Sequence, residues 1–187
     1  MVKKKTCVFI SGAGSNLKSI INNSRDPNFP ININLVLCNN KNAAGIKYAK
    51  KFSIPFKVIS GEINKFEHIA IKEISEKKIK LICLAGFMKI LSKNFLRKFK
   101  GKIINIHPSL LPKYKGLNTH EKVIKNKDKF SGCTVHFVTE KLDSGKIIIQ
   151  KKVKRFKFDT PQSLSKRILF EENKLYPIAI KKILTKI

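Results

Sequence analysis

Tryptophan is absent from this sequence of 187 residues, acidic residues are few, and no apolar run approaches the length of a membrane span. A membrane-crossing helix needs about 20 consecutive apolar residues, so we expect no membrane partner. The apolar stretch after the basic first residues is much shorter than the hydrophobic region of a signal peptide, and it runs into a glycine turn. Together these absences predict a cytoplasmic protein.

Closely spaced cysteines are also missing. The four cysteines, Cys7, Cys38, Cys83 and Cys133, lie far apart, and apolar or small residues flank each of them. Structural metal sites and redox motifs usually place two cysteines a few residues apart. We therefore expect four buried, reduced thiols and no metal, with a metal site assembled from distant ligands as the alternative.

Negative charge is scarce: 12 Asp and Glu residues stand against 40 Lys and Arg residues, which gives a net charge of +28. Such an excess favours binding to a phosphate backbone. However, only Arg25, Arg97, Arg155 and Arg167 are arginines, and the lysines are spread over every segment. Arginine is the preferred bidentate reader of phosphates and bases. We therefore expect small-molecule substrates and no specific nucleic acid, with a basic nucleic-acid-binding domain as the alternative.

The length and the apolar content of 42% fit one packed domain better than two. Apolar, β-rich runs alternate with segments of helical spacing through the first hundred residues, a pattern typical of a parallel sheet covered by helices. Strands are expected at residues 6–11, 33–38, 56–59, 81–84 and 102–106. Helices are expected at residues 16–23, 43–51, 65–77 and 92–98.

The rhythm changes after residue 107, where a loop containing proline and glycine leads to a short helix at 119–125. Two strands follow, at 133–139 and 146–153, and the short connection between them predicts an antiparallel pair. A long helix at 161–183 closes the fold. Pro161 suits its first turn, whereas Pro177 should kink or interrupt it. The predicted fold class is thus α/β: an open, mostly parallel twisted sheet with an antiparallel strand pair and a long helix near the C-terminus.

A glycine-containing loop, residues 11–16 (SGAGSN), separates the first predicted strand from the first helix. This arrangement places backbone N–H groups and the positive end of a helix dipole together, which is a geometry that binds phosphate. The spacing is neither that of a P-loop nor that of the dinucleotide fingerprint. A tight turn in which Ser15 caps the helix is the alternative.

A second group of polar residues begins at the fifth predicted strand. Asn105 and His107 lie two positions apart, so on a strand their side chains face the same way. Both can point off its carboxyl end, where open α/β sheets bind ligands. An amide beside an imidazole can stabilise an oxyanion and transfer a proton. Asp143 lies in a turn that could fold back to them, where its carboxylate would raise the pKa of His107 and orient the ring.

Four stretches carry a family resemblance: residues 9–17 (FISGAGSNL), 84–92 (LAGFMKILS), 105–114 (NIHPSLLPKY), and 135–139 with 143–145 (VHFVT and DSG). In this order along nearly the whole chain, they resemble the phosphoribosylglycinamide formyltransferases, the folate-dependent enzymes of purine synthesis. Methionyl-tRNA formyltransferases share the His-x-Ser-Leu-Leu-Pro element but carry a second domain. Formyltetrahydrofolate hydrolases typically differ at the position of Pro108 and have an N-terminal regulatory domain.

The resemblance implies a Rossmann-like formyltransferase fold, with a ribonucleotide-phosphate-binding half at 1–100 and a catalytic and folate-binding half at 101–187. It implies that Asn105, His107 and Asp143 are catalytic. The amine of 5-phosphoribosylglycinamide would attack the formyl carbon of 10-formyltetrahydrofolate, while charged His107 and Asn105 stabilise the oxyanion. Asp143 would keep His107 protonated and help to relay the proton. No metal and no covalent enzyme intermediate are needed, and a monomer or weak homodimer is expected.

The resemblance also implies the binding residues. For the ribonucleotide substrate they are Gly14, Ser15, Asn16 and Glu172. For the folate they are Met88, Lys89, Ile90, Leu91 and Asn105.

The sequence departs from the family pattern at a few positions. Ala13 replaces a larger, usually polar residue, Lys89 stands where arginine is common, Lys115 replaces a proline and Asn118 replaces a histidine. These changes surround the expected folate pocket, so they put folate affinity in doubt and leave the catalytic trio intact. A sugar-nucleotide N-formyltransferase with the same trio is a further alternative within the enzyme class.

Overall fold

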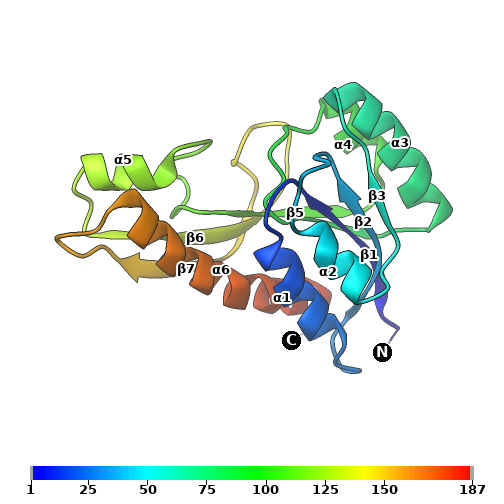
Figure 1. The fold of residues 1–187 in the computed structure, drawn as a ribbon, viewed down its shortest axis with the longest axis horizontal. Helices are drawn as coiled ribbons and strands as arrows, with labels where there is room; N and C mark the ends of the chain where they lie inside the picture. Colours follow the sequence, from blue (N-terminus) through cyan, green and yellow to red (C-terminus); the bar gives the residue numbers. More distant parts are fainter. Residues whose placement is uncertain (1, 186–187) are drawn as a thin grey trace. The chain divides into compact units, whose positions relative to one another are not determined.

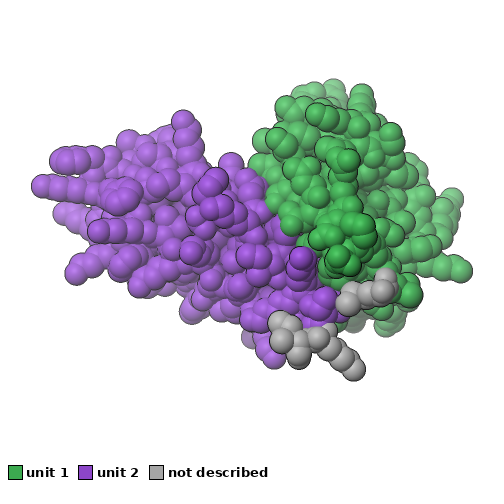
Figure 2. Space-filling model, turned by 90° about the horizontal axis from the view of Figure 1, so that it is seen from below, with its two compact units in different colours: residues 1–104 green, residues 105–187 purple. Residues whose placement is uncertain are grey.

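The computed structural model of the protein describes residues 2–185. Its strands form a seven-stranded sheet with the order β3-β2-β1-β4-β5-β6-β7 (Figure 1). Contacts along the chain separate two compact units, residues 1–104 and residues 105–187 (Figure 2). The mostly parallel sheet, the antiparallel pair at its end and the long last helix confirm the expected fold class.

The first unit alternates strands and helices as its sequence pattern predicts. Its elements are β1 (Lys4–Ile10), α1 (Ser15–Ser24), β2 (Ile31–Cys38), α2 (Ile46–Lys51), β3 (Phe56–Val58), α3 (Ile63–Glu76), β4 (Leu81–Leu84) and α4 (Lys93–Lys98). Strand β1 pairs in parallel with β2 on one side and with β4 on the other. Strand β5 (Lys102–His107) crosses the boundary between the units.

The core of the first unit forms around β1, whose residues Cys7, Val8, Phe9 and Ile10 are fully buried. A strand that lies between two parallel neighbours has both faces covered, which explains its continuous apolar run. The Phe9 ring makes edge contacts with Phe66 of α3 and Phe95 of α4, with ring centroids 5.2 and 6.1 Å apart. These aromatic contacts fix both helices against the central strand.

The second unit contains α5 (Thr119–Lys125), β6 (Phe130–Phe137), β7 (Ile147–Lys154) and α6 (Pro161–Leu184). Strands β6 and β7 are antiparallel, with Val135 opposite Ile149, as the short connection between them predicts. Helix α6 packs against both strands. Its side chains Leu164, Ile168 and Tyr176 are almost completely buried.

Two local predictions differ from the structure. Pro177 does not interrupt helix α6, which is continuous from Pro161 to Leu184. A proline inside a helix costs about 3 kcal/mol, and here the apolar face that α6 buries against β6 and β7 holds the helix together on both sides of it. Helix α2 begins at Ile46 rather than at residue 43, because Ala43 lies in a turn in which its N–H donates to the Asn40 carbonyl.

The four cysteines are free and buried, as expected. Burial raises the pKa of the Cys133 thiol to about 12. Burial also raises the pKa of Cys7 well above its ordinary value. Such thiols stay protonated at neutral pH and behave as small apolar side chains. Within residues 2–185, no helix combines the length and the apolar character that a membrane span requires.

Candidate functional site

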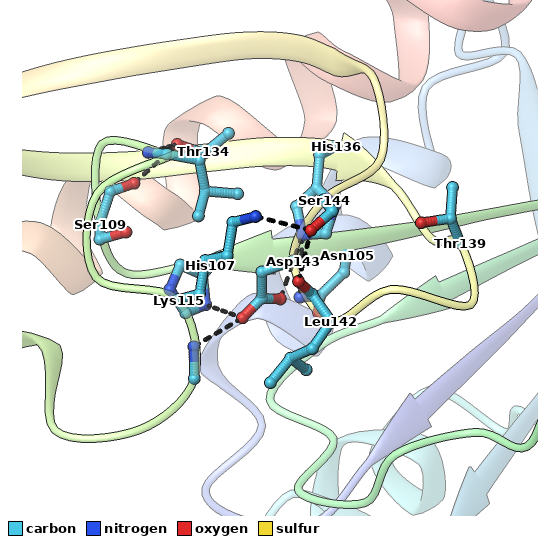
Figure 3. Close-up of polar contacts among 12 residues, drawn as sticks. Asn105, His107, Ser109, Lys115, Thr134, His136, Thr139, Leu142, Asp143 and Ser144 are labelled. Carbon is cyan, nitrogen blue, oxygen red and sulfur yellow. Dashed lines mark hydrogen bonds and ion pairs between the residues drawn. The ribbon is translucent and has the colours of Figure 1, made fainter.

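Three polar side chains that the sequence singles out come together in the second unit. Asn105 and His107 lie two residues apart at the carboxyl end of β5 and project from the same face. Asp143 lies in the connection between β6 and β7, where its φ of 45° marks a tight turn. Figure 3 shows the Asp143 carboxyl group among the side chains of His107, His136 and Asn105.

Asp143 contacts both histidines through different oxygen atoms. Its Oδ2 lies 3.3 Å from Nδ1 of His107, and its Oδ1 lies 3.5 Å from Nε2 of His136 (Figure 3). The backbone N–H of Gly116 also donates to Oδ2, at 2.9 Å. These donors outweigh the burial of the carboxyl group and lower the pKa of Asp143 below its ordinary value. Asp143 is therefore ionised at neutral pH.

The expected rise in the pKa of His107 does not occur in the free protein. The ring is only 6% exposed, and this burial lowers its pKa from the ordinary value of 6.5. The Asp143 carboxylate and the Tyr114 carbonyl, which lies 2.8 Å from Nε2, act in the opposite direction but do not overcome the burial. Both ring nitrogens nevertheless face oxygen acceptors, so the surroundings are arranged to hold an imidazolium once a proton is supplied.

Tyr114 reaches His107 because its backbone is in the left-handed region, with a φ of 55°. Its phenolic oxygen donates to Asp128 Oδ2 at 2.9 Å and accepts from the Asn126 amide at 2.7 Å. The side chain is thus fixed on one side while its carbonyl faces the catalytic candidate on the other. The Lys115 ammonium, at one of the positions that depart from the family pattern, donates to the Ser144 hydroxyl at 2.7 Å.

His136 is a site residue to which the sequence analysis assigned no role. It lies on β6, is 2% exposed, and donates from Nδ1 to the Phe137 carbonyl at 2.9 Å. Its Nε2 lies 3.3 Å from the amide nitrogen of Asn105 and 3.5 Å from Oδ1 of Asp143, so one ring atom faces both residues. A histidine in a strand with no other ionisable residue except Cys133 was the available signal, but the sequence does not show that this strand brings it to Asn105.

We expect His136→Asn to lower kcat by about 10- to 100-fold, because Asn105 and Asp143 would both lose a partner that fixes their position. Steady-state kinetics measure the effect, and thermal melting checks that the variant is folded. An unchanged kcat in a folded variant would show that Asn105 and Asp143 do not depend on His136.

The electrostatic balance at His107 leads to a second prediction, which concerns the titration midpoint of its ring. NMR titration measures this midpoint. The titration midpoint of the free protein lies below 6.5, because burial disfavours the charged form. Asp143→Asn lowers the midpoint further, because it removes an anion that favours the imidazolium. A midpoint above 6.5 in the free protein, or an upward shift in the variant, would contradict this balance.

The predicted phosphate loop lies in the first unit, between β1 and α1. Gly14 is the N-cap of α1, with a φ of 75°, and it uses no side chain to cap the helix. Ser15 is the first helical residue, so the alternative in which Ser15 caps the helix is wrong. A Cβ on Gly14 would lie 2.6 Å from the Gly45 Cα, so only glycine permits this backbone conformation and this close approach. Asn16 is buried.

The residues expected to line the folate pocket lie between β4 and α4 in the first unit. Met88 and Ile90 are 71% and 68% exposed, and Lys89 is exposed as well. Leu91 is buried, so its side chain belongs to the core. Large exposed apolar side chains that lie close together in the sequence are typical of a ligand or partner surface.

Glu172 and the two remaining departures lie on or beside the helices. Glu172 is a buried residue of α6, with 7% of its surface exposed. Asn118 is the N-cap of α5, with a φ of 59°, a conformation that asparagine tolerates better than most residues. Ala13 is exposed in the phosphate loop. Within residues 2–185, no three side chains of His, Cys, Asp or Glu are grouped so that they could hold a metal ion.

Comparison with known proteins places these features in a family context. A model of the formyl transferase family matches residues 4–180. The trifunctional purine biosynthetic protein adenosine-3 of Homo sapiens is 42% identical over 182 residues, which cover 95% of this chain and 18% of that protein. The chain thus spans less than a fifth of that relative.

Relatives of similar length also match. The phosphoribosylglycinamide formyltransferase of Haemophilus influenzae is 41% identical over 183 residues, which cover 95% of this chain and 86% of that protein. The crystal structure of phosphoribosylglycinamide formyltransferase from Brucella melitensis superposes with a TM-score of 0.92 at 36% identity, covering 99% of this chain and 97% of that one.

Proposed function

Since the chain belongs to the formyl transferase family, we propose that it transfers a formyl group from 10-formyltetrahydrofolate to the amine of 5-phosphoribosylglycinamide. The products are N-formylglycinamide ribonucleotide and tetrahydrofolate, in purine synthesis. One observation carries the proposal: Asn105, His107 and Asp143 lie together at the end of β5, with the Asp143 carboxylate 3.3 Å from the His107 ring.

The reaction forms one bond and breaks another at the formyl carbon. The substrate amine attacks this carbon, and negative charge develops on the formyl oxygen. The tetrahedral intermediate then collapses, the bond between the carbon and the folate nitrogen breaks, and the proton lost by the amine ends on that nitrogen. The formyl carbon keeps its oxidation state, so the transfer needs no redox partner.

Asn105 and His107 are the groups that would stabilise the oxyanion. In the free protein, the amide nitrogen of Asn105 faces His136, and Nε2 of His107 faces the Tyr114 carbonyl. The formyl oxygen would take the place of these partners. Donors that are already oriented and buried stabilise a developing charge more than water does.

His107 also has a role in moving the proton. Its lowered pKa keeps the ring neutral in the free protein at neutral pH, so Nε2 can accept the proton that the attacking amine loses, and the N–H formed in this way then donates to the oxyanion. The charge that develops on the formyl oxygen and the ionised Asp143 both favour the resulting imidazolium. The imidazolium then returns the proton to the leaving folate nitrogen, a relay that contributes about 10²–10⁴-fold to rate in enzymes.

The binding residues follow from the chemistry of the two substrates. Gly14 is the N-cap of α1, and Ser15 and Asn16 begin the helix, where the positive end of the helix dipole suits the ribonucleotide phosphate. Glu172 is the proposed contact of the glycinamide end. Met88, Lys89 and Ile90 expose apolar surface and a positive charge that suit a folate with its anionic glutamate.

Leu91 and Asn105 differ from the other proposed folate residues. Leu91 is buried, so it supports the pocket from the core side rather than exposing its side chain. Asn105 would contact the folate through the formyl group. We also propose that the protein is cytoplasmic and that it is a monomer or a weak homodimer.

An absorbance assay of the folate product tests the reaction and its acceptor together. The protein is first mixed with 10-formyltetrahydrofolate, and 5-phosphoribosylglycinamide is added last. We expect the absorbance change to begin only on this addition. A change that proceeds without the ribonucleotide would indicate hydrolysis, and a change only with a sugar-nucleotide amine would identify a different acceptor.

A further inference from the structure

Residues 86–92, which we name the 86–92 segment, connect β4 to α4 and contain the exposed Met88 and Ile90. A connection with two large exposed apolar side chains would be expected to move freely in water. Here, however, the Phe87 ring packs against both Phe9 and Phe66, with ring centroids 5.4 and 5.1 Å away. The segment is therefore attached to the core between its exposed side chains and β4.

Ser11 holds the beginning of the segment. It lies directly after β1, is 7% exposed, and comes 77 positions before Met88 in the chain. Its hydroxyl accepts the backbone N–H of Met88 at 2.8 Å, and its own N–H donates to the Gly86 carbonyl at 3.2 Å. One residue thus makes a hydrogen bond on each side of Phe87.

Glu67 holds the end of the segment. This residue of α3 is 7% exposed, and its Oε1 accepts the backbone N–H of Ser92 at 2.6 Å. Its Oε2 accepts the Ser92 hydroxyl at 2.5 Å. The same hydroxyl accepts the Phe95 N–H and so caps α4. The carboxyl group of Glu67 thus binds both the N–H and the hydroxyl of Ser92, so this end of the segment is fixed both to α3 and to α4.

We propose that Ser11 and Glu67 are positioning residues for the formyl donor: they fix the backbone of the 86–92 segment so that Met88 and Ile90 present a preformed surface to the folate. The inference rests on the proposed function, which assigns the folate to this segment. A segment that is ordered before binding loses less conformational entropy on binding, and this increases affinity without any added contact.

The Ser11 hydroxyl holds only the 86–92 segment, which is proposed to bind the formyl donor, although Ser11 also begins the phosphate loop. The loop is held by other bonds: the Gly45 N–H donates to the Gly12 carbonyl at 2.9 Å, and the Asn40 amide donates to the Ser11 carbonyl at 3.0 Å. Ser11→Ala removes neither bond. The variant should therefore weaken donor binding and leave ribonucleotide binding unchanged.

The test compares Ser11→Ala, Glu67→Gln and the double variant with the wild-type protein. Gln keeps the length of Glu67 but cannot accept both Ser92 donors. Titration with tetrahydrofolate measures binding at the folate site without catalysis. We expect the Kd of tetrahydrofolate to rise about 5- to 30-fold in each single variant. This is the size of the loss expected when a buried N–H or O–H group loses its hydrogen-bond acceptor. Because both residues hold one segment, the double variant should show less than the product of the two effects.

Two further readouts separate positioning from a general loss of structure. Steady-state kinetics should show a raised KM for 10-formyltetrahydrofolate and an unchanged KM for the ribonucleotide. Amide hydrogen exchange at Met88 should be at least about tenfold faster in Ser11→Ala, while β1 exchanges as before. Ser131→Ala, which removes a buried hydroxyl in the second unit, is the matched control and should behave as wild type.

The proposal would be overturned by an unchanged exchange rate at Met88, by an unchanged Kd for tetrahydrofolate in both single variants, or by equal rises in both KM values. A wild-type protein without formyl transfer activity would instead contradict the proposed function. Hydrogen exchange and tetrahydrofolate titration still decide the positioning question in that case, because neither depends on turnover.

Discussion

Replacing His107 with alanine is expected to lower kcat by about 10³–10⁴-fold, the largest effect of any single change in this protein. The imidazole is expected to donate to the oxyanion and to relay the proton, and each of these tasks contributes about 10²-fold or more. Water that enters the vacated space is not oriented by Asp143 and Tyr114 as the ring is. Because the ring is buried, thermal melting must show that the variant is folded.

His68→Ala is the control for this experiment, because it makes the same change at an exposed histidine of α3 in the other unit. Its kcat should equal that of the wild-type protein. Near-normal turnover of folded His107→Ala would show that His107 has no part in the chemistry and that another group moves the proton.

Asp143→Asn is expected to lower kcat by about 10²–10³-fold. The substitution keeps the size of the side chain and the acceptor for the Gly116 N–H, but it removes the charge 3.3 Å from the His107 ring. An imidazolium that forms during the reaction would then lack its counter-ion inside a buried site. Single-turnover kinetics separate this effect on the chemical step from any effect on product release.

Asp26→Asn provides the matched control, since Asp26 is an exposed turn residue whose carboxylate accepts the Asn28 N–H. It should leave kcat unchanged. If Asp143→Asn retained more than about a third of the wild-type kcat, the charge of Asp143 would not assist the reaction, and the role of His107 would have to be explained by Tyr114 and Asn105 alone.

Much of the fold follows from local sequence pattern. Alternation of β-rich runs with helical spacing predicts the order of the elements, since each needs an apolar face to bury. It also places Asn105 and His107 on one face of β5, because side chains two residues apart on a strand point the same way. Predictions of elements that depend on tertiary context are less accurate, as the uninterrupted helix through Pro177 shows.

That Asn105, His107 and Asp143 lie together was predictable from the sequence, but their surroundings were not. The resemblance singles out Asp143, but the contact of His136 with Asn105 depends on how β6 lies beside β5, which pattern does not specify. The direction of the His107 pKa depends on how completely the ring is buried, and burial is a property of the whole fold. The same holds for Ser11 and Glu67, whose partners are 77 and 25 positions away in the chain.

The identity of the acceptor is the central claim, and tracing the formyl carbon tests it most directly. The donor carries ¹³C in its formyl group, and 5-phosphoribosylglycinamide and a sugar-nucleotide amine are offered together in one reaction followed by ¹³C NMR. We predict that the label appears in the N-formyl amide of the ribonucleotide, in an amount equal to the tetrahydrofolate formed. Label in free formate, or in the sugar nucleotide, would contradict the proposed function.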